Sequence, residues 1–378
     1  MSSIIYCKKC LFPNTKPDLF FNNEGICDAC LSAKRKYEYQ SSNAVDWEQR
    51  EKEFEKILEI SKQNSGEMYN CIVPVSGGKD STWQAYAMKK IHHMKPLAVT
   101  FDQFDQTETG LYNLEVLRDI GVDHIHFTLN PNIVKKLVYK GFEIVGDPYW
   151  VNHVGIWTVP MHFANLFKAP LVVFGENPIF EYGGPEYRRD NLVLDKRWRQ
   201  EFGGMRGFRE EDMVDDEISA EDLKILNFPK DEDVRKNKIL GTFYGYFFRW
   251  EPLKHTEFVK TIGWKPLDEV PAGAWMNYEN CDMKYIDIRE RVKFLKYGYG
   301  RATDQLCIGI RNKFITRKEA IDIVTEVDGK VDPKNIEDFC KYLNISLEKY
   351  NEIMDSFVNI ELFTKNQKNE WVLKNNIL

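Results

Sequence analysis

The sequence predicts an α/β fold in which helices cover both faces of a parallel sheet, with a small metal-binding module before it and a mainly helical region after it. Three observations predict this fold. Short apolar runs alternate with helical patterns through the first half of the chain, and four cysteines form two CxxC pairs near the N-terminus. The last third of the sequence is largely helical in its apolar spacing.

Residues 1–40 are predicted to form a four-cysteine module. Cys7-x2-Cys10 and Cys27-x2-Cys30 are separated by sixteen residues, within the range of paired CxxC zinc sites. Four thiolates satisfy a structural Zn²⁺ ion and leave no open position for catalysis. A redox-active CxxC pair and an iron–sulfur cluster are the alternatives. We expect zinc that stabilises the module and takes no part in the reaction.

The next two regions are a connecting helix and the predicted sheet. Residues 41–68 carry Trp47, Phe54 and Leu58 roughly at helical spacing. Residues 69–180 are expected to form the ligand-binding domain, because parallel sheets bind ligands beyond the carboxyl ends of their strands. Its expected strands lie in the apolar runs 71–76, 95–102, 123–130 and 169–177, and its expected helices near 81–94, 111–120, 132–145 and 154–168.

The second half of the chain is predicted as two regions. Residues 181–240 are charged and dotted with glycine, which indicates an insertion that could act as a lid. Residues 241–378 are expected to be a mainly helical substrate region that begins with a strand pair near 241–251. Thr316 and Glu319 form a capping box, which predicts a helix start.

Composition narrows the classes of function. The 52 basic and 58 acidic residues give a net charge of −6, which disfavours a protein built to hold a nucleic-acid backbone. No apolar run approaches the roughly 18 to 20 residues of a membrane-spanning helix, and we expect no membrane partner. The N-terminus lacks a secretory signal, so we expect a cytoplasmic protein with reduced thiols. Four cysteines outside the module are then expected in the core: Cys71, Cys281, Cys307 and Cys340.

A phosphate-binding loop is the strongest functional signal. The sequence Ser76-Gly77-Gly78-Lys79-Asp80-Ser81 follows a buried-type strand and opens a helix. The glycines let several N–H groups point at one anion, and the helix N-terminus adds partial positive charge. It is not a Walker A loop, because Val73 and Asp80 occupy positions that the Walker pattern gives to Gly and Ser or Thr. Asp80 suggests either a magnesium-bridged pyrophosphate or a helix cap, and an ordinary connecting turn is the bland alternative.

The loop resembles the pyrophosphate-binding loop of the PP-loop ATP pyrophosphatases, a superfamily with an adenine nucleotide alpha hydrolase-like fold. The resemblance implies that this loop holds the pyrophosphate that leaves ATP. It also implies that the end of the next strand, including Thr100 and Asp102, meets the nucleotide. The implied reaction is attack of a substrate oxygen on the α-phosphorus, which gives an adenylate.

The whole chain resembles the N-acetyl sugar amidotransferases. The resemblance rests on CKKC…CDAC, SGGKDS, FGENP (174–178) and, most specifically, FLKYGYGRATDQLCIGIRNKFITRKEAI (294–321). Members of this family make acetamidino sugars for pseudaminic acid, legionaminic acid and lipopolysaccharide O-antigens. The resemblance implies that ATP and Mg²⁺ activate an acetamido oxygen, that ammonia displaces AMP, and that an amidine remains.

Four more residues are candidates for this chemistry, each with a structural alternative. Glu176 could hold Mg²⁺ or orient ammonia, or belong to a helix start. Asp102 could touch ribose or metal, or cap a turn. Arg301 and Asp304 could grip phosphate or substrate, or form an ion pair with other side chains.

A set of arginines and aromatic residues in the charged region suits a carboxylate-bearing sugar, since guanidinium groups match carboxylates and aromatic faces cover sugar rings. Solvated surface is the alternative. The set comprises Tyr182, Tyr187, Arg188, Arg189, Arg197, Trp198, Arg199 and Arg206. His153 and His162 lie nine residues apart in an apolar helical stretch, and we expect them in the core.

The source of ammonia is expected outside this sequence. One class of glutaminase uses a cysteine directly after the initiator methionine, where this chain has Ser2. No other cysteine lies at a Gly-flanked elbow of the second class. A separate glutaminase subunit (HisH/HisF-like) or free ammonium is therefore the expected donor.

Two other functions compete. A tRNA-thiolating enzyme can combine zinc cysteines with this loop, but it needs a basic RNA path, which the charge of −6 disfavours. It often also needs a catalytic cysteine near the loop, and Cys71 lies too early in its strand. A nucleotide-binding subunit without activity is the third hypothesis, disfavoured by the intact Lys79 and Asp80.

Overall fold

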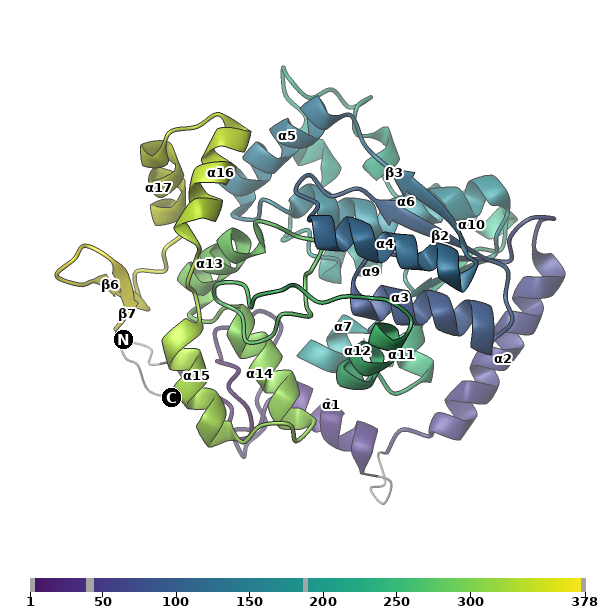
Figure 1. Cartoon of the computed structure of the whole chain (residues 1–378), viewed down its shortest axis with the longest axis horizontal. Helices are drawn as coiled ribbons and strands as arrows, with labels where there is room; N and C mark the ends of the chain where they lie inside the picture. Colours follow the sequence, from purple (N-terminus) through teal and green to yellow (C-terminus); the bar gives the residue numbers. More distant parts are fainter. Residues whose placement is uncertain (1–3, 39–43, 186–189, 375–378) are drawn as a thin grey trace.

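A five-stranded parallel sheet organises the protein. The computed structural model describes residues 4–38, 44–185 and 190–374 (Figure 1). The sheet has the order β3-β2-β1-β4-β5. Its strands are β1 (Cys71–Pro74), β2 (Pro96–Phe101), β3 (Asp123–Phe127), β4 (Leu171–Phe174) and β5 (Leu240–Phe243), and a separate antiparallel hairpin joins β6 (Phe363–Lys365) to β7 (Trp371–Leu373).

Helices account for most of the remaining regular structure. Before the first strand lie α1 (Asp28–Tyr37) and α2 (Trp47–Asn64). Between β1 and β4 lie α3 (Lys79–Tyr86) with the π-helical segment Ala87–Ile91, α4 (Glu108–Ile120), α5 (Pro131–Lys140) with the π-helical segment Gly141–Val145, and α6 (Trp150–Phe167). Between β4 and β5 lie α7 (Pro178–Tyr182), α9 (Lys196–Phe202), the 3-10 helices Glu210–Met213 and Lys224–Leu226, and α10 (Asp231–Lys236). After β5 come α11 (Tyr244–Phe247), α12 (Pro252–Thr261), α13 (Ile286–Tyr297), α14 (Arg301–Arg311), α15 (Arg317–Val327), α16 (Pro333–Leu343) and α17 (Leu347–Ser356).

The sheet separates two apolar cores, as the predicted α/β class requires. Alternate side chains of β1 point to opposite faces: Ile72 packs on the α6 side, whereas Cys71 and Val73 pack on the side of α2, α3 and α4. Because both faces are covered, the inner strands β2 and β4 are nearly continuous apolar runs, whereas the edge strand β3 is polar and partly exposed. The four strands expected between residues 71 and 177 are confirmed, as are the helices between them.

The predicted strand pair near 241–251 is wrong. Residues Leu240–Phe243 form a single strand that pairs in parallel with β4, with Leu171 opposite Leu240 and Phe174 opposite Phe243. Tyr244 then begins a short helix. The local sequence is strand-like on both sides of this point, but the parallel partner is about seventy residues earlier and could not be seen from the run itself. β5 thus brings part of the range 241–378 into the central sheet.

The ligand-binding role predicted for Trp198 and Arg199, in the part of residues 181–240 that the structure describes, is wrong. Trp198 is fully buried and joins the core on the α6 side. Arg199 is buried too, and its Nη1 donates to Glu210 Oε1 at 2.6 Å and to the carbonyl of Leu226. This arginine therefore stabilises the insertion from inside. Arg197 pairs with Glu201 on the surface, and Tyr187, Arg188 and Arg189 lie outside the described residues.

The N-terminal module packs against the C-terminal helices. Its cysteines and Phe12 share one apolar cluster with Ala302 and Leu306 of α14 and Val324 of α15. Figure 1 shows this purple segment beside the green α14 and α15. The capping box at the start of α15 is confirmed: Glu319 N donates to Thr316 Oγ1, and Thr316 N donates to Glu319 Oε2. Among the described helices none combines the length and the apolar character that crossing a bilayer requires.

Candidate functional site

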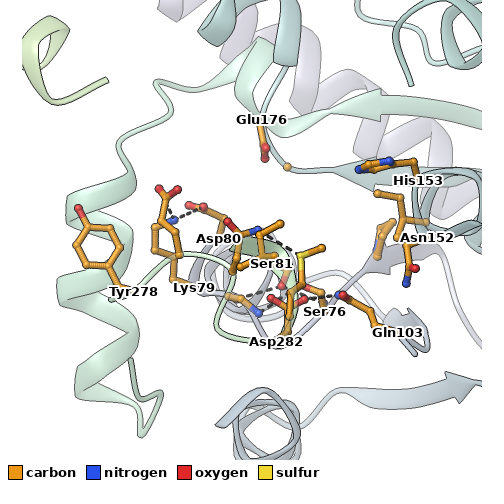
Figure 2. A pocket seen from close by; sticks show the side chains of 18 of the residues that line it. Ser76, Lys79, Asp80, Ser81, Gln103, Asn152, His153, Glu176, Tyr278 and Asp282 are labelled. Atoms are coloured by element: carbon orange, nitrogen blue, oxygen red, sulfur yellow. Dashed lines mark hydrogen bonds and ion pairs between the residues drawn. The ribbon is translucent and has the colours of Figure 1, made fainter. Parts of the chain in front are cut away.

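A cavity of about 380 Å³ lies beyond the carboxyl ends of β1 and β4. This is the edge of a parallel sheet at which ligands bind. The loop 76–81 forms one wall, and Gly175 and Glu176 form another. The first turn of α6 contributes Asn152 and His153, and residues 278–289 close the remaining side (Figure 2). The phosphate loop and the C-terminal region therefore face the same space.

The loop is held in an anion-binding shape by its own hydroxyls and by one distant indole. Ser76 N donates to Ser81 Oγ at 3.3 Å, and Ser81 Oγ donates to the carbonyl of Gly78 at 3.0 Å. Trp264 Nε1 donates to the carbonyl of Gly77 at 2.9 Å. The backbone of α3 begins at Lys79, so its first N–H groups lack intrahelical acceptors and border the cavity.

Gly77 is required by both conformation and space. Its φ is +88°, in the left-handed region. A Cβ at this position would lie 2.5 Å from the carbonyl oxygen of Gly110 on α4. Gly78 differs, because its φ is −72° and the nearest atom to a Cβ there would be Ser76 Oγ at 3.4 Å.

Lys79 is the centre of a buried charge network. Its Nζ lies 2.6 Å from Asp80 Oδ2 and 3.4 Å from Glu279 Oε1, and only 4% of the residue is exposed. Glu279 also accepts a hydrogen bond from Arg301 at the start of α14. Burial disfavours the Lys79 ammonium, but Asp80 and Glu279 outweigh burial and raise its pKa. Lys79 therefore stays charged, as a phosphate-binding lysine must.

Asp80 faces the network from two directions. Its Oδ2 meets Lys79, and its Oδ1 accepts from His255 Nδ1 of α12 at 3.0 Å. Burial raises the pKa of this carboxyl, but Lys79 and His255 outweigh burial and hold the pKa below its usual range. Asp80 is thus a charged carboxylate inside the loop, where it holds Lys79 in place.

Two other carboxyl groups of the cavity titrate near neutral pH. Burial, together with the charge of Asp80, raises the pKa of Glu176 to about 7. Burial also raises the pKa of Asp282 to about 6, although Ser76 and Gln103 donate hydrogen bonds to it. Figure 2 shows Glu176 on the wall opposite Lys79 and Asp80. Oxygen ligands of this kind suit Mg²⁺, which would also lower both pKa values.

The far side of the cavity is polar. Figure 2 shows Gln103, Asn152 and His153 grouped away from Lys79. Arg289 of α13 lines this part and its Nε lies 3.3 Å from both carboxylate oxygens of Asp147. The core position predicted for His153 is therefore wrong, since His153 lines the cavity. His162 is hydrogen-bonded to the carbonyl of Asn227 at 2.8 Å.

The structure brings some of the predicted residues together and separates others. Ser76, Gly78, Lys79, Asp80, Ser81, Glu176 and Arg301 line the cavity, with Gly77 in the same loop, and so does Tyr182. Thr100 and Asp102 do not line it: Thr100 Oγ1 donates to the carbonyl of Val75, and Asp102 accepts from His126 and Thr128. Asp304 pairs with Lys293 Nζ at 2.5 Å, which matches its structural alternative.

Sequence reasoning missed several residues of the site. Glu279 and Asp282 come from an irregular segment, and His255 comes from α12. A carboxylate in a loop carries no periodicity, so nothing in the sequence distinguishes Glu279 from a solvated surface acid. Each contact also spans long sequence separations, about 200 residues between Lys79 and Glu279. For Glu279 and Asp282, the one available sequence signal was their position shortly before the distinctive segment 294–321.

The four module cysteines form a cluster with the dimensions of a single-ion site. Their ligand atoms all lie within 4.8 Å of one another. Sulfur–sulfur distances are 4.0 Å for Cys7 and Cys30 and 3.6 Å for Cys10 and Cys27, close to the value of about 3.8 Å that four sulfurs at 2.3 Å from one tetrahedral ion give. In a [4Fe–4S] cluster each thiolate binds a different iron, and in a [2Fe–2S] cluster two pairs of thiolates bind separate irons, so both need some sulfurs farther apart than these. The cluster could therefore hold one metal ion.

Replacing Gly77 should disrupt the loop, whereas replacing Gly78 should not. We expect Gly77→Ala to lower the free energy of unfolding by about 2 to 5 kcal/mol, since left-handed backbone and a steric clash both cost energy. Gly78→Ala should change it by less than about 1 kcal/mol. Urea unfolding of both variants measures this difference, and equal values for the pair would contradict the loop geometry.

Replacing Cys27 should remove a bound metal. We expect Cys27→Ser to lose most of the metal that copurifies with the wild type and to unfold at a lower temperature, because the module has a small core of its own. Elemental analysis and thermal unfolding measure both effects. Cys340→Ala, outside the cluster, should keep the full metal content. A wild type without stoichiometric metal after anaerobic purification would refute the site.

A comparison with known protein families finds a match in the C-terminal part of the chain. Residues 273–377, which include Glu279, Asp282, Arg289 and Arg301, match the family described as LPS biosynthesis protein WbpG-like, C-terminal domain. No curated protein sequence matches the chain.

Solved structures give weaker likenesses. An NMN synthetase from Francisella tularensis is 13% identical, with 51% of this chain and 92% of that chain covered and a TM-score of 0.28. A U34-tRNA thiolase, NcsA, from Methanococcus maripaludis with its [4Fe-4S] cluster is 10% identical, with 87% and 90% covered and a TM-score of 0.31. These scores are too low to carry an argument. The comparison that counts is the family match, in which residues 273–377 are similar to the C-terminal domain of WbpG-like LPS biosynthesis proteins.

Proposed function

We propose that this protein is an ATP-dependent amidotransferase that converts the acetamido group of a bacterial sugar to an acetamidino group. The sugar is of the pseudaminic or legionaminic type or a diacetamido uronic acid. ATP is split to AMP and pyrophosphate, and ammonia supplies the nitrogen. Two facts support the proposal. The loop is expected to bind the pyrophosphate of ATP, and residues 273–377 match a family of lipopolysaccharide biosynthesis.

One observation carries the proposal. Glu279 and Arg301, in the WbpG-like region, are tied through an ion-pair chain to Lys79 of the phosphate loop, and all three residues line one cavity. A nucleotide bound by the loop would therefore lie next to the region that matches a family of sugar biosynthesis. This is the arrangement needed to transfer AMP to an oxygen of a sugar substituent.

The loop and its network suit the first step. The acetamido oxygen attacks the α-phosphorus of ATP, the bond to pyrophosphate breaks, and the acetamido N–H proton is lost, which leaves an O-adenylyl imidate. Negative charge grows on the leaving pyrophosphate. Lys79 and the first N–H groups of α3 would stabilise that charge, since fixed donors and cations in a site poor in water do so most effectively.

Glu176 and Asp282 are the residues that would hold Mg²⁺ on the cavity side of the loop. Burial raises the pKa of both carboxyl groups even though Lys79 lowers it, so a further cation would stabilise their ionised forms. A Mg²⁺ ion would offset the charge of the triphosphate. Lys79 alone cannot do this, because Asp80 and Glu279 already neutralise it in part.

The second step forms the amidine. The lone pair of ammonia attacks the imidate carbon, and the carbon–oxygen bond to AMP then breaks, so that AMP leaves with that electron pair. The product keeps the proton as an amidinium ion. A deep site protects the imidate from water until ammonia arrives. A separate glutaminase subunit or free ammonium is the proposed source, and zinc in the cysteine module would have a structural role.

Loss of the Lys79 charge should abolish AMP formation. We expect Lys79→Met to lower the rate of AMP release in the presence of ATP, ammonium and diacetamido sugars by at least about 10²-fold, as removal of one strong transition-state donor does. Lys265→Met, at an exposed lysine, should leave the rate unchanged. Full activity of Lys79→Met would overturn the loop assignment. AMP formation that depends on RNA instead of sugar would favour tRNA thiolation.

Binding of Mg²⁺ and ATP at pH 7 should release a proton from Glu176. With its pKa raised to about 7, about half of this carboxyl is protonated at pH 7, and a cation binds only the ionised form. We expect release of about half a proton, increasing as the pH falls toward 6 and vanishing above about 9. Calorimetry in two buffers of different ionisation enthalpy measures it. Glu176→Gln should remove most of the release at pH 7 and leave the smaller part that comes from Asp282, and unchanged release would exclude Glu176 as a ligand.

A further inference from the structure

A second hollow opens on the surface on the far side of residues 278 and 279. Its volume is about 400 Å³. The end of α1, the start of α12 and the segment after α14 form its walls, with Tyr37, Pro252, Leu253 and Phe314 among the lining side chains. Phe314 is 53% exposed.

A small void lies between this hollow and the central cavity. It shares Pro252, Leu253 and Phe314 with the outer hollow, and it shares Tyr278 and Glu279 with the central cavity. The outer hollow, the void and the cavity are therefore consecutive neighbours. Two pairs of side chains separate them: Leu253 and Phe314 on the outside, and Tyr278 and Glu279 on the inside.

The size and the lining of the void restrict what it can admit. Its volume is about 20 Å³, and a space for one water-sized molecule needs roughly 10 to 15 Å³. Most of its wall is apolar, including Trp275, Met276 and Ile308. Entry of an ion into such a space carries a large desolvation cost, whereas a small neutral molecule enters without it. A sugar or a nucleotide is far too large.

The wall of the void is fixed on one side and charged at its inner end. Gln305 Oε1 accepts from the backbone N–H of Trp275 at 2.6 Å and of Met276 at 3.2 Å, which holds this segment against α14. At the inner end, burial raises the pKa of Glu279, but Lys79 and Arg301 outweigh burial and lower it. The Glu279 carboxylate is therefore charged and can accept an N–H hydrogen bond.

We infer that the outer hollow and the void form a separate entrance through which ammonia reaches the cavity. The inference rests on the proposed function, in which ATP and a sugar occupy the central cavity. Ammonia then needs another way into the cavity. The apolar void passes neutral NH₃ and rejects NH₄⁺, which cannot attack a carbon. Glu279 receives the molecule at the inner end, next to the phosphate loop.

The test is the ammonium dependence of amidine formation at saturating ATP and diacetamido sugar, followed by mass spectrometry. Leu253→Trp and Ile308→Phe add bulk to the wall of the void. We expect each to raise the KM for ammonium by about tenfold or more and to leave the KM for ATP and sugar unchanged, because only access of ammonia is impaired. Leu253→Ala should admit methylamine and yield the N-methyl amidine.

Leu347→Trp, at an exposed leucine of α17, is the matched control and should behave as the wild type. An unchanged KM for ammonium in both bulky variants would overturn the inference. A parallel rise in the KM for ATP in both would also overturn it, since Leu253 and Ile308 would then support the nucleotide site instead of a path for ammonia. If the wild type forms no amidine from any acetamido sugar, the proposed function fails before the entrance is tested.

Discussion

The site depends on a buried chain of charges that runs from Asp80 through Lys79 and Glu279 to Arg301, with His255 hydrogen-bonded to Asp80 at one end. Each charge would be costly to bury alone, by several kcal/mol even after relaxation. Together they satisfy one another, because Glu279 lies between Lys79 and Arg301, Asp80 lies between Lys79 and the Nδ1 atom of His255, and Lys79 lies between two carboxylates. The chain joins α3, α12 and α14, so the loop can hold Lys79 in place only when the second half of the protein is folded around it. Phosphate binding must then compete with Asp80 and Glu279 for one ammonium group, which couples nucleotide binding to the C-terminal region.

The cysteine module supports the same site from the other side. α14 begins with Arg301, which faces the cavity, and its next turns carry Ala302 and Leu306, which pack against the module. The backbone N–H of Leu11 donates to Cys307 Sγ, and Arg317 donates to the carbonyl of Cys10. A metal ion that orders residues 7–30 would therefore also hold the helix that carries Arg301.

Local patterns in the sequence predicted much of the fold. Apolar runs located the four strands between residues 71 and 177, and the capping box located the start of α15. The loop at 76–81 was evident because its backbone needs glycine at a special position. What could not be predicted comes from long-range packing. β5 pairs with a strand far back in the chain, and Trp198 and Arg199 are buried by an insertion whose composition suggests a solvated surface. Glu279 and Asp282 become site residues only because an irregular segment folds back onto the loop.

In the proposed reaction an oxygen of the sugar's acetamido group attacks the α-phosphorus of ATP. The most direct measurement uses a diacetamido sugar labelled with ¹⁸O in its acetamido carbonyls, incubated with the protein, ATP and ammonium, followed by mass spectrometry of the AMP. If the acetamido oxygen attacks the α-phosphorus, one ¹⁸O atom appears in the phosphate of each AMP formed and the sugar becomes an amidine. AMP without label, or ADP in place of AMP, would contradict it.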